Sequence, residues 1–268
     1  MKIVIDDDFD LYKIAYSGQC FRVRQTDDNA FRFVTKNHCV TICGKDTDYD
    51  VSCTADEWNL IWRHYFDLDT DYRKIRDSIP DNDCYLKNAV EIGRGIRILR
   101  QDSFEMLISF IISQRKSIPA IKSSVEALCQ KYGEPIDDEG LYTFPTPESL
   151  AKTSESELAQ CSLGYRVPYV MQAAQRVSSG VARLDKLSAL SDDELIDELK
   201  SFYGVGNKVA NCVALFSYHR TSLAPVDTWI QKVIDTEYGG INPFESYGQY
   251  AGVMQQYMFY AAQHEKII

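Results

Sequence analysis

The chain has 268 residues and a formal net charge of −10, with 45% hydrophobic and 12% aromatic residues. This length can bury a sizeable core in one large or two to three small domains, and the aromatic content excludes a disordered chain. No apolar run approaches the roughly 20 residues that cross a bilayer, and the start, MKIVIDDDFDLYK, lacks the apolar core of a signal peptide, so we expect a cytoplasmic protein.

The first 79 residues are mostly strand-like. The segments MKIVI, CFRVR, FRFV and CVTIC alternate apolar and polar side chains, which is typical of a sheet covered on one face. Lys36 and Asn37 predict a hairpin turn between two of these strands. Thr54 and Glu57 have the spacing of a capping box, and we expect the helix that they begin to cover the sheet.

The sequence does not predict a metal centre. Asp67, Asp69 and Asp71 imitate the start of a calcium loop, but Tyr72 stands where the loop needs glycine and Ser78 where it needs glutamate. The eight cysteines are scattered singly, without a C-x-x-C pair, which indicates reduced thiols and argues against zinc. We therefore expect no metal ligands among the site residues.

From about Gly95 the periodicity becomes helical. Asp102 begins one helix, which breaks between residues 113 and 117, and a second runs over 118–132. A proline-rich connection, PTPESL, then leads to a helix near residues 156–161. The second part of the chain is therefore expected to be mostly helical.

A glycine hairpin lies between two helical segments in SFYGVGNKVANC. Gly204 and Gly206 flank Val205, and glycine accepts backbone angles that other residues avoid, so the chain can reverse with its N–H groups pointing outward. Outward N–H groups suit a phosphate. The helix that follows is apolar almost all round, which is typical of a helix buried within a domain.

Lys208 lies in the first turn of that buried helix. The helix dipole and burial both disfavour an ammonium ion there, so both favour the neutral, nucleophilic amine. Cys212, four residues on, shares its helical face. Asp227 follows Pro225 and is placed to cap a helix starting near Thr228. Taken singly, these features also fit a plain turn, a surface lysine and a structural cap.

Taken together, GVGNKVANC and the downstream PVD resemble the helix-hairpin-helix (HhH-GPD) DNA glycosylases, whose signature is a glycine hairpin, a lysine and a later aspartate. The resemblance implies that Lys208 attacks the C1′ atom of a damaged nucleotide. Asp227 is then expected to stabilise the developing oxocarbenium charge and to orient the nucleophile. Attack by an amine leaves a Schiff base, so strand cleavage by β-elimination should follow base removal.

Two further segments resemble the 8-oxoguanine DNA glycosylases of this superfamily. In SGQCFR, the carbonyl of Gly18 is expected to accept a hydrogen bond from the N7–H that 8-oxoguanine has and guanine lacks. YAGVMQQYMFYA resembles a segment that places a glutamine at the edge of the base and a phenylalanine on its face, here Gln255 and Phe259. Cys212 is then expected to stack on the other face.

The residues expected to hold the DNA match the family only in part. Its consecutive asparagines and arginine, which contact the orphaned cytosine, are replaced in a segment that includes Gln114, Arg115 and Ala120. We expect Gln114 and Arg115 to fill the hole left by the extruded base, without support for cytosine selectivity. Tyr165 and Arg166 do match, and in the family the tyrosine wedges into the base stack while the arginine meets the opposite base.

The resemblance spans nearly the whole chain and implies an α+β fold. Residues 1–94 are expected to form a TBP-like antiparallel sheet domain with a covering helix, and residues 95–268 two helical subdomains flanking the active-site cleft. Some members carry an iron–sulfur cluster on four cysteines after the aspartate, but no cysteine follows Asp227, so no cluster is expected. Hairpins of the superfamily often bind a monovalent cation, and the sequence leaves this open.

Damaged double-stranded DNA is the implied partner of a monomer that is not bound to membranes. The net charge of −10 opposes this, because nucleic-acid binders usually carry a positive footprint. Acid is nevertheless concentrated at 6–10, 46–50 and 67–71, whereas the basic residues between 94 and 122 have few acidic neighbours, so a local basic face is compatible with the sequence.

Three alternatives stay open. An alkylpurine glycosylase of the same superfamily, which the segment from Gln114 to Ser117 suggests, uses the aspartate to help water attack and does not need Lys208. A non-catalytic helix-hairpin-helix module explains the hairpin but not Lys208, Asp227 and Gly18 together. A metabolic enzyme with a fortuitous hairpin is favoured only by the acidic charge.

Overall fold

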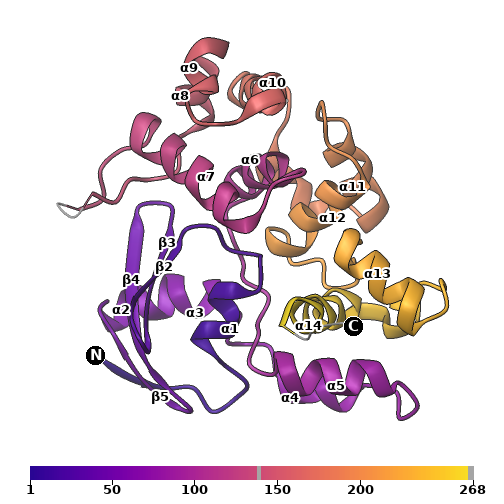
Figure 1. Ribbon diagram of the computed structural model, residues 1–268. Helices are drawn as coiled ribbons and strands as arrows, with labels where there is room; N and C mark the ends of the chain where they lie inside the picture. Colours follow the sequence, from indigo (N-terminus) through magenta and orange to yellow (C-terminus); the bar gives the residue numbers. More distant parts are fainter. Residues whose placement is uncertain (138–139, 265–268) are drawn as a thin grey trace.

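The structure is a computed structural model that describes residues 1–137 and 140–264, and it combines an antiparallel sheet with a larger helical part (Figure 1). The strands are β1 (Lys2–Val4), β2 (Val23–Asp27), β3 (Ala30–Thr35), β4 (His38–Lys45) and β5 (Asp48–Val51), in the spatial order β1-β5-β4-β3-β2. The helices are α1 (Leu11–Tyr16), α2 (Ala55–Glu57), α3 (Arg63–Tyr65), α4 (Tyr72–Asp77), α5 (Cys84–Gly93), α6 (Ser103–Ser113), α7 (Ile118–Tyr132), α8 (Pro147–Ala151), α9 (Glu155–Ala159), α10 (Val167–Ser178), α11 (Asp192–Lys200), α12 (Asn207–Phe216), α13 (Thr228–Glu237) and α14 (Ala251–His264). The expected α+β class is confirmed.

The N-terminal sheet follows the alternation in the sequence. The expected strand segments correspond to β1 through β4, and the expected turn joins β3 to β4, with Lys36 at a φ of 50°. The sequence analysis does not predict β5, because aspartate, which is depleted in strands, makes up half of its sequence, DYDV. Its buried residues, Tyr49 and Val51, are nevertheless two apart, as in a strand with one covered face.

A helical segment covers the sheet, as expected. The Thr54 hydroxyl accepts a hydrogen bond from the Glu57 backbone N–H at 3.2 Å, and α2 begins there. The chain continues through a π-helical turn (Trp58–Trp62) into α3. Trp58 and Trp62 are buried in one core with the inward side chains of the sheet, including the fully buried Phe33. The covering segment therefore completes the first core.

The second core differs in extent from the expected domain at 95–268. Helices α4 and α5 precede residue 94 but contribute Tyr72, Ile75 and Leu86 to the core of the helical part, where α5 packs along α14 (Figure 1). The two cores do not divide at one point in the sequence, because Phe21 also belongs to the second core and Leu99 belongs to the first. The apolar face of α5 finds its partner more than 150 residues later, and no local pattern in the sequence shows this.

Capping side chains set the helix boundaries beside the site. The Asp102 carboxylate accepts hydrogen bonds from the backbone N–H groups of Phe104 and Glu105, both at 3.0 Å, and begins α6. The break over residues 114–117 and the following helix, α7, lie where the sequence places them. In the described part of the chain, no helix is long and apolar enough to span a bilayer.

Candidate active site

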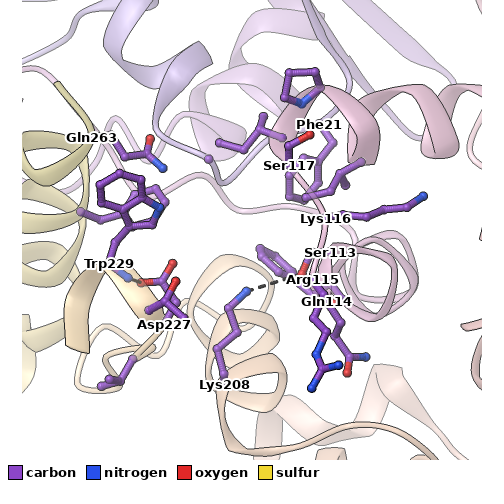
Figure 2. A pocket seen from close by; sticks show the side chains of 18 of the residues that line it. Phe21, Ser113, Gln114, Arg115, Lys116, Ser117, Lys208, Asp227, Trp229 and Gln263 are labelled. Carbon is purple, nitrogen blue, oxygen red and sulfur yellow. Dashed lines mark hydrogen bonds between the residues drawn. The ribbon is translucent and has the colours of Figure 1, made fainter. Parts of the chain in front are cut away.

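The ends of several helices meet around a cavity of about 860 Å³ (Figure 2). The C-terminal end of α6 and the loop after it form one wall, and α12, α13 and α14 contribute the others. Six of the residues expected from the sequence line this cavity: Gly18, Gln114, Arg115, Lys208, Asp227 and Phe259. The fold thus brings together residues that are up to 241 positions apart (259 − 18).

Lys208 points into the cavity from the first turn of α12 (Figure 2). Its Nζ lies 3.5 Å from Ser113 Oγ and 5.2 Å from the centroid of the Phe110 ring. Ser113 Oγ in turn donates to the Phe110 carbonyl at 2.8 Å, so its lone pairs face the amine. A hydroxyl acceptor and an aromatic face therefore hold the amine at the cavity wall.

Asp227 faces the same space as Lys208 (Figure 2). It is the N-cap of α13, as expected: Oδ1 accepts hydrogen bonds from the backbone N–H groups of Trp229 at 3.0 Å and Ile230 at 2.9 Å. The cap uses only Oδ1, so Oδ2 is left to act on a group in the cavity. The two backbone hydrogen bonds therefore hold the Asp227 carboxylate in one orientation.

Gly18 lies against Phe259 at the opposite wall. Its φ is 77°, and a Cβ at this position would lie 2.9 Å from Phe259 Cε1. Only glycine accepts this backbone angle without strain and also leaves room for the ring. The next residue fixes the segment, because Gln19 donates to the Arg97 carbonyl at 2.8 Å and accepts from the Leu99 N–H at 2.8 Å. The Gly18 carbonyl is therefore part of a rigid surface.

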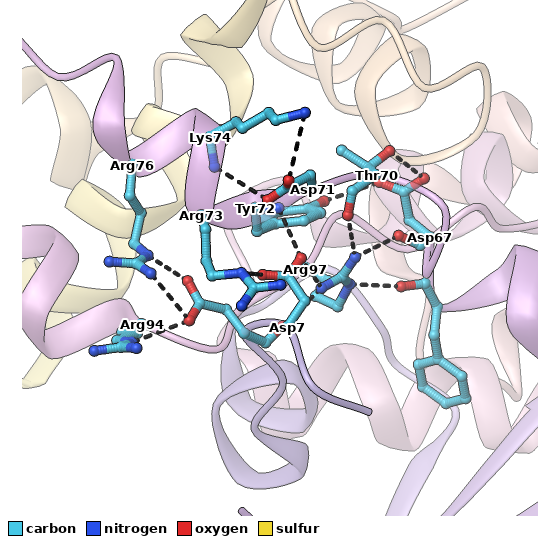
Figure 3. Close-up of polar contacts among 12 residues, drawn as sticks. Asp7, Asp67, Thr70, Asp71, Tyr72, Arg73, Lys74, Arg76, Arg94 and Arg97 are labelled. Carbon is cyan, nitrogen blue, oxygen red and sulfur yellow. Dashed lines mark hydrogen bonds and ion pairs between the residues drawn. The ribbon is translucent and has the colours of Figure 1, made fainter. Parts of the chain in front are cut away.

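Behind this segment, a buried guanidinium joins the sheet domain to the helices (Figure 3). Arg97 is fully buried, and its carbon Cζ lies 4.1 Å from the centroid of the Tyr72 ring. It donates to the Asp7 carboxylate at 3.1 Å and to the backbone carbonyls of Asp8, Phe66, Asp67 and Thr70 at 2.6 to 3.1 Å. A buried charge with this many acceptors is well satisfied. Because the Arg97 carbonyl also holds Gln19, Arg97 ties the Gly18 segment to the sheet domain and to the helices.

Cys212 and Gln255 are close to the cavity in sequence but do not line it. Cys212 is 3% exposed and Gln255 is 2% exposed, and Gln255 Oε1 accepts a hydrogen bond from Gln256 Nε2 at 3.0 Å. Burial raises the pKa of the Cys212 thiol, which keeps it protonated. Neither side chain therefore lines the cavity in this structure, and their contact with a damaged base stays a prediction.

Gln263 and Trp229 line the cavity without having been predicted to do so. Gln263 follows Phe259 by four residues, so it extends the same face of α14, and this spacing is visible in the sequence. Trp229, 43% exposed, stands two residues after the capping aspartate, where its position alone assigns it no role. Gln263 adds a hydrogen-bonding group and Trp229 an aromatic surface to the lining of the cavity.

Arg166 is buried rather than presented to a ligand. It is 5% exposed, its Nε donates to the Gln114 carbonyl at 3.0 Å with Nη2 contacting the same oxygen, and Nη1 donates to the Leu163 carbonyl at 3.0 Å. In this structure Arg166 is therefore not presented to a ligand, and its contact with the opposite base stays a prediction. Instead it fixes the loop that carries Arg115, which is exposed and has a φ of 52°. Tyr165, by contrast, is 50% exposed.

The hairpin exposes backbone rather than side chains. Gly204 has a φ of 81°, and nothing lies within 4 Å of a Cβ built at Gly206. Val205 is 7% exposed, and its N–H donates to the Phe202 carbonyl at 3.0 Å, so its side chain anchors the turn. Gly206 and Asn207 are exposed, and the first N–H groups of a helix have no partner within it, so the start of α12 is open to a ligand.

The charge at the cavity is opposite in sign to that of the chain. Its ionisable lining residues are Arg115, Lys116, Lys208 and Asp227, three basic and one acidic. Lys116 is held by the Ser162 carbonyl at 2.6 Å. Across residues 1–137 and 140–264, no group of three or more histidine, cysteine, aspartate or glutamate side chains is arranged to hold a metal ion.

Comparisons with known proteins agree with this geometry. Residues 2–107 match the model of the 8-oxoguanine DNA glycosylase N-terminal domain, and residues 108–250 match that of the HhH-GPD superfamily base excision DNA repair proteins. This chain is similar to the structure of MBOgg1 in complex with a low-affinity DNA ligand, with 36% sequence identity and a TM-score of 0.93. The match covers 98% of this chain and 94% of the MBOgg1 chain.

Two further relatives extend the comparison. One is the 8-oxoguanine glycosylase/lyase of Clostridium acetobutylicum, whose structure contains double-stranded DNA with cytosine opposite 8-oxoguanine. Its sequence identity to this chain is 33% and the TM-score is 0.92, and the match covers 100% of this chain and 99% of the Clostridium chain. The N-glycosylase/DNA lyase of Saccharomyces cerevisiae is 31% identical over 190 residues, which are 65% of this chain. The matched region spans only 50% of the yeast protein.

Proposed function

Because this chain belongs to the HhH-GPD superfamily of base excision DNA repair proteins, we propose that it excises 8-oxoguanine from duplex DNA and then cleaves the strand. The observation that carries the proposal is that Lys208 and Asp227 face one cavity whose far wall is Gly18 and Phe259. A water-attacking glycosylase has no need of the lysine, and a plain DNA-binding module needs neither residue.

The proposed chemistry begins with Lys208 in its neutral form. Its Nζ lone pair attacks C1′ of the flipped nucleotide as the bond from C1′ to N9 breaks, and the base leaves with that electron pair and takes up a proton. Asp227 stabilises the positive charge that develops on the sugar, through the carboxylate oxygen that the helix cap does not use.

Strand cleavage then follows from the covalent intermediate. The amine and the opened sugar form a Schiff base, which acidifies the C2′ hydrogen. Loss of that proton expels the 3′ phosphate by β-elimination, and water finally releases Lys208 from the product. Both activities thus use the same nitrogen atom, so the enzyme is a bifunctional glycosylase and lyase.

The base is recognised between α14 and the Gly18 segment. Phe259 covers one face, and the Gly18 carbonyl accepts the N7–H of 8-oxoguanine. Cys212 and Gln255, which are buried one helical turn from Lys208 and Phe259, respectively, are proposed to contact the other face and the edge of the bound base. Tyr165 is proposed to wedge into the base stack, and Gln114 and Arg115 to fill the hole left by the extruded base.

The hairpin N–H groups of Gly204 and Gly206 are proposed to bind a phosphate of the damaged duplex, whereas that of Val205 donates to the Phe202 carbonyl. A monovalent cation, if bound, would be held by the hairpin backbone and would supply positive charge there. The protein acts as a cytoplasmic, DNA-associated monomer. Arg115 and Lys116, against Asp227, supply at the cavity the local positive charge that the whole chain lacks.

Borohydride trapping tests the proposal. A duplex with one 8-oxoguanine is incubated with enzyme and borohydride, with each of the four bases opposite the lesion and with Lys208→Gln as control. A covalent adduct that the control lacks is expected, and its dependence on the opposite base reports what Arg115 and Ala120 have changed. Base release from alkylated DNA without an adduct would instead support the alkylpurine class.

A further inference from the structure

Three tyrosine side chains form a continuous row between the loop that carries Tyr165 and the glycine hairpin. This tyrosine row consists of Tyr165, Tyr169 and Tyr203. The first two ring centroids are 6.0 Å apart with an interplanar angle of 78°, and the last two are 4.7 Å apart with an angle of 82°. Both pairs are edge-to-face, which is a favourable geometry that fixes each ring relative to the next.

The two ends of the tyrosine row are open to solvent. Tyr165 is 50% exposed and Tyr203 is 55% exposed, while Tyr169 is partly buried between them. Single exposed aromatic residues are common, but rings that line up across two separate elements form a surface, and such surfaces mark binding faces.

The hairpin is built against the tyrosine row. A Cβ at Gly204 would lie 2.4 Å from Tyr169 Cδ2, so the hairpin backbone packs directly on that ring. The Tyr203 backbone N–H donates to Gln172 Oε1 at 3.2 Å, which ties the start of the hairpin to α10. At the other end, Tyr165 Oη lies 3.5 Å from the Gln114 carbonyl at the cavity. The row therefore connects the phosphate-binding hairpin to the cavity.

We propose that Tyr203 is a second aromatic contact to DNA, whose ring packs against a deoxyribose of the strand that the hairpin holds. Tyr169 is the positioning residue between Tyr203 and Tyr165. A sugar fits this place because it adjoins the phosphate at the hairpin N–H groups and offers an apolar face that does not depend on base sequence. The inference rests on the proposed function, since it needs duplex DNA at this face.

Binding measurements in the Lys208→Gln background, where no turnover occurs, test the contact. Tyr203→Ala is expected to weaken binding to a duplex with one 8-oxoguanine about tenfold, within the range of aromatic contacts to nucleic acid, whereas Tyr203→Phe keeps the ring and stays within about twofold. Tyr12→Ala is the matched control, because Tyr12 is 48% exposed and its ring also packs on another tyrosine, Tyr16, at 4.6 Å.

A series of duplexes separates direct contact from mere support of the fold. The duplex on either side of the lesion is shortened one nucleotide at a time. The loss of binding affinity caused by Tyr203→Ala is expected to vanish once the nucleotide that Tyr203 contacts has been removed. A loss that is equal at every length, or absent at all lengths, would overturn the contact. Failure of the parent Lys208→Gln protein to bind any duplex would instead refute the proposed function, so the two failures are distinguishable.

Discussion

Gly18→Ala is the substitution for which the structure predicts the sharpest separation of stability from activity. The new Cβ would lie 2.9 Å from Phe259 Cε1, closer than real Cβ contacts, and 3.3 Å from Cζ, tighter than most, and the residue would have to keep a φ of 77°. The backbone angle alone costs about 1 to 2 kcal/mol for alanine, or about 3 to 6 °C in Tm for a chain of this size.

The contact adds an effect on catalysis, because either the ring or the Gly18 carbonyl must move. A misplacement of about 1 Å can reduce a rate about 100-fold when the reacting geometry depends on it. We therefore expect single-turnover excision of 8-oxoguanine to slow by at least about tenfold. Excision is followed on a labelled duplex with enzyme in excess, after thermal unfolding has shown that the variant is folded.

Gly239→Ala is the matched control. Gly239 has a φ of 60°, but nothing lies within 4 Å of a Cβ built there, so it carries the same conformational cost without the contact. Both variants should lose similar stability, and only Gly18→Ala should lose excision. Equal excision rates for the two variants would refute the view that the approach of Phe259 to Gly18 shapes the base pocket.

Three other predictions address charge. Asp227→Asn should leave Tm nearly unchanged, because asparagine caps helices about as well as aspartate, while excision falls about 100- to 1,000-fold without the carboxylate charge. Arg97→Met should lower the free energy of unfolding in urea by about 3 to 5 kcal/mol, because the Asp7 carboxylate and several buried carbonyls lose their donor. Burial raises the pKa of Glu105 to about 7, so the folded state holds a proton that the unfolded state releases, and stability should fall as pH rises from about 4.5 to 7. Glu105→Gln should flatten this dependence in urea titrations at each pH, and an unchanged slope would rule out Glu105 as its source.

Local patterns predict much of this site because its anchors are local. Asp102 and Asp227 cap helices through hydrogen bonds to residues two or three positions later, so sequence spacing alone locates the ends of α6 and α13. The hairpin fixes Lys208 in the first turn of α12 by the same logic. Motif order then places these elements around one cavity.

Where the structure differs from the expected placement of a side chain, the common physical cause is tertiary contact. Arg166 is chemically able to meet a base, but the Gln114 and Leu163 carbonyls take up its donors. Gln255 shares a helical face with Phe259, yet it is turned into the core, where Gln256 donates to it. Spacing along a helix gives the face of a residue, whereas partners from elsewhere in the chain decide whether that face is open.

The acidity of the chain also has a structural resolution. Several of the acidic residues are paired internally: Asp8 accepts from Arg94 at 3.0 Å, and Asp67 contacts Arg100 at 2.8 Å and His219 at 2.9 Å. Charges in 0.15 M salt are screened over about 8 Å, so a phosphate at the cavity responds to the charges beside it rather than to the total. Arg115 and Lys116 stand there against Asp227. Duplex binding should therefore depend on salt through these few positive charges, and removing Arg115 should reduce the slope by about one ion.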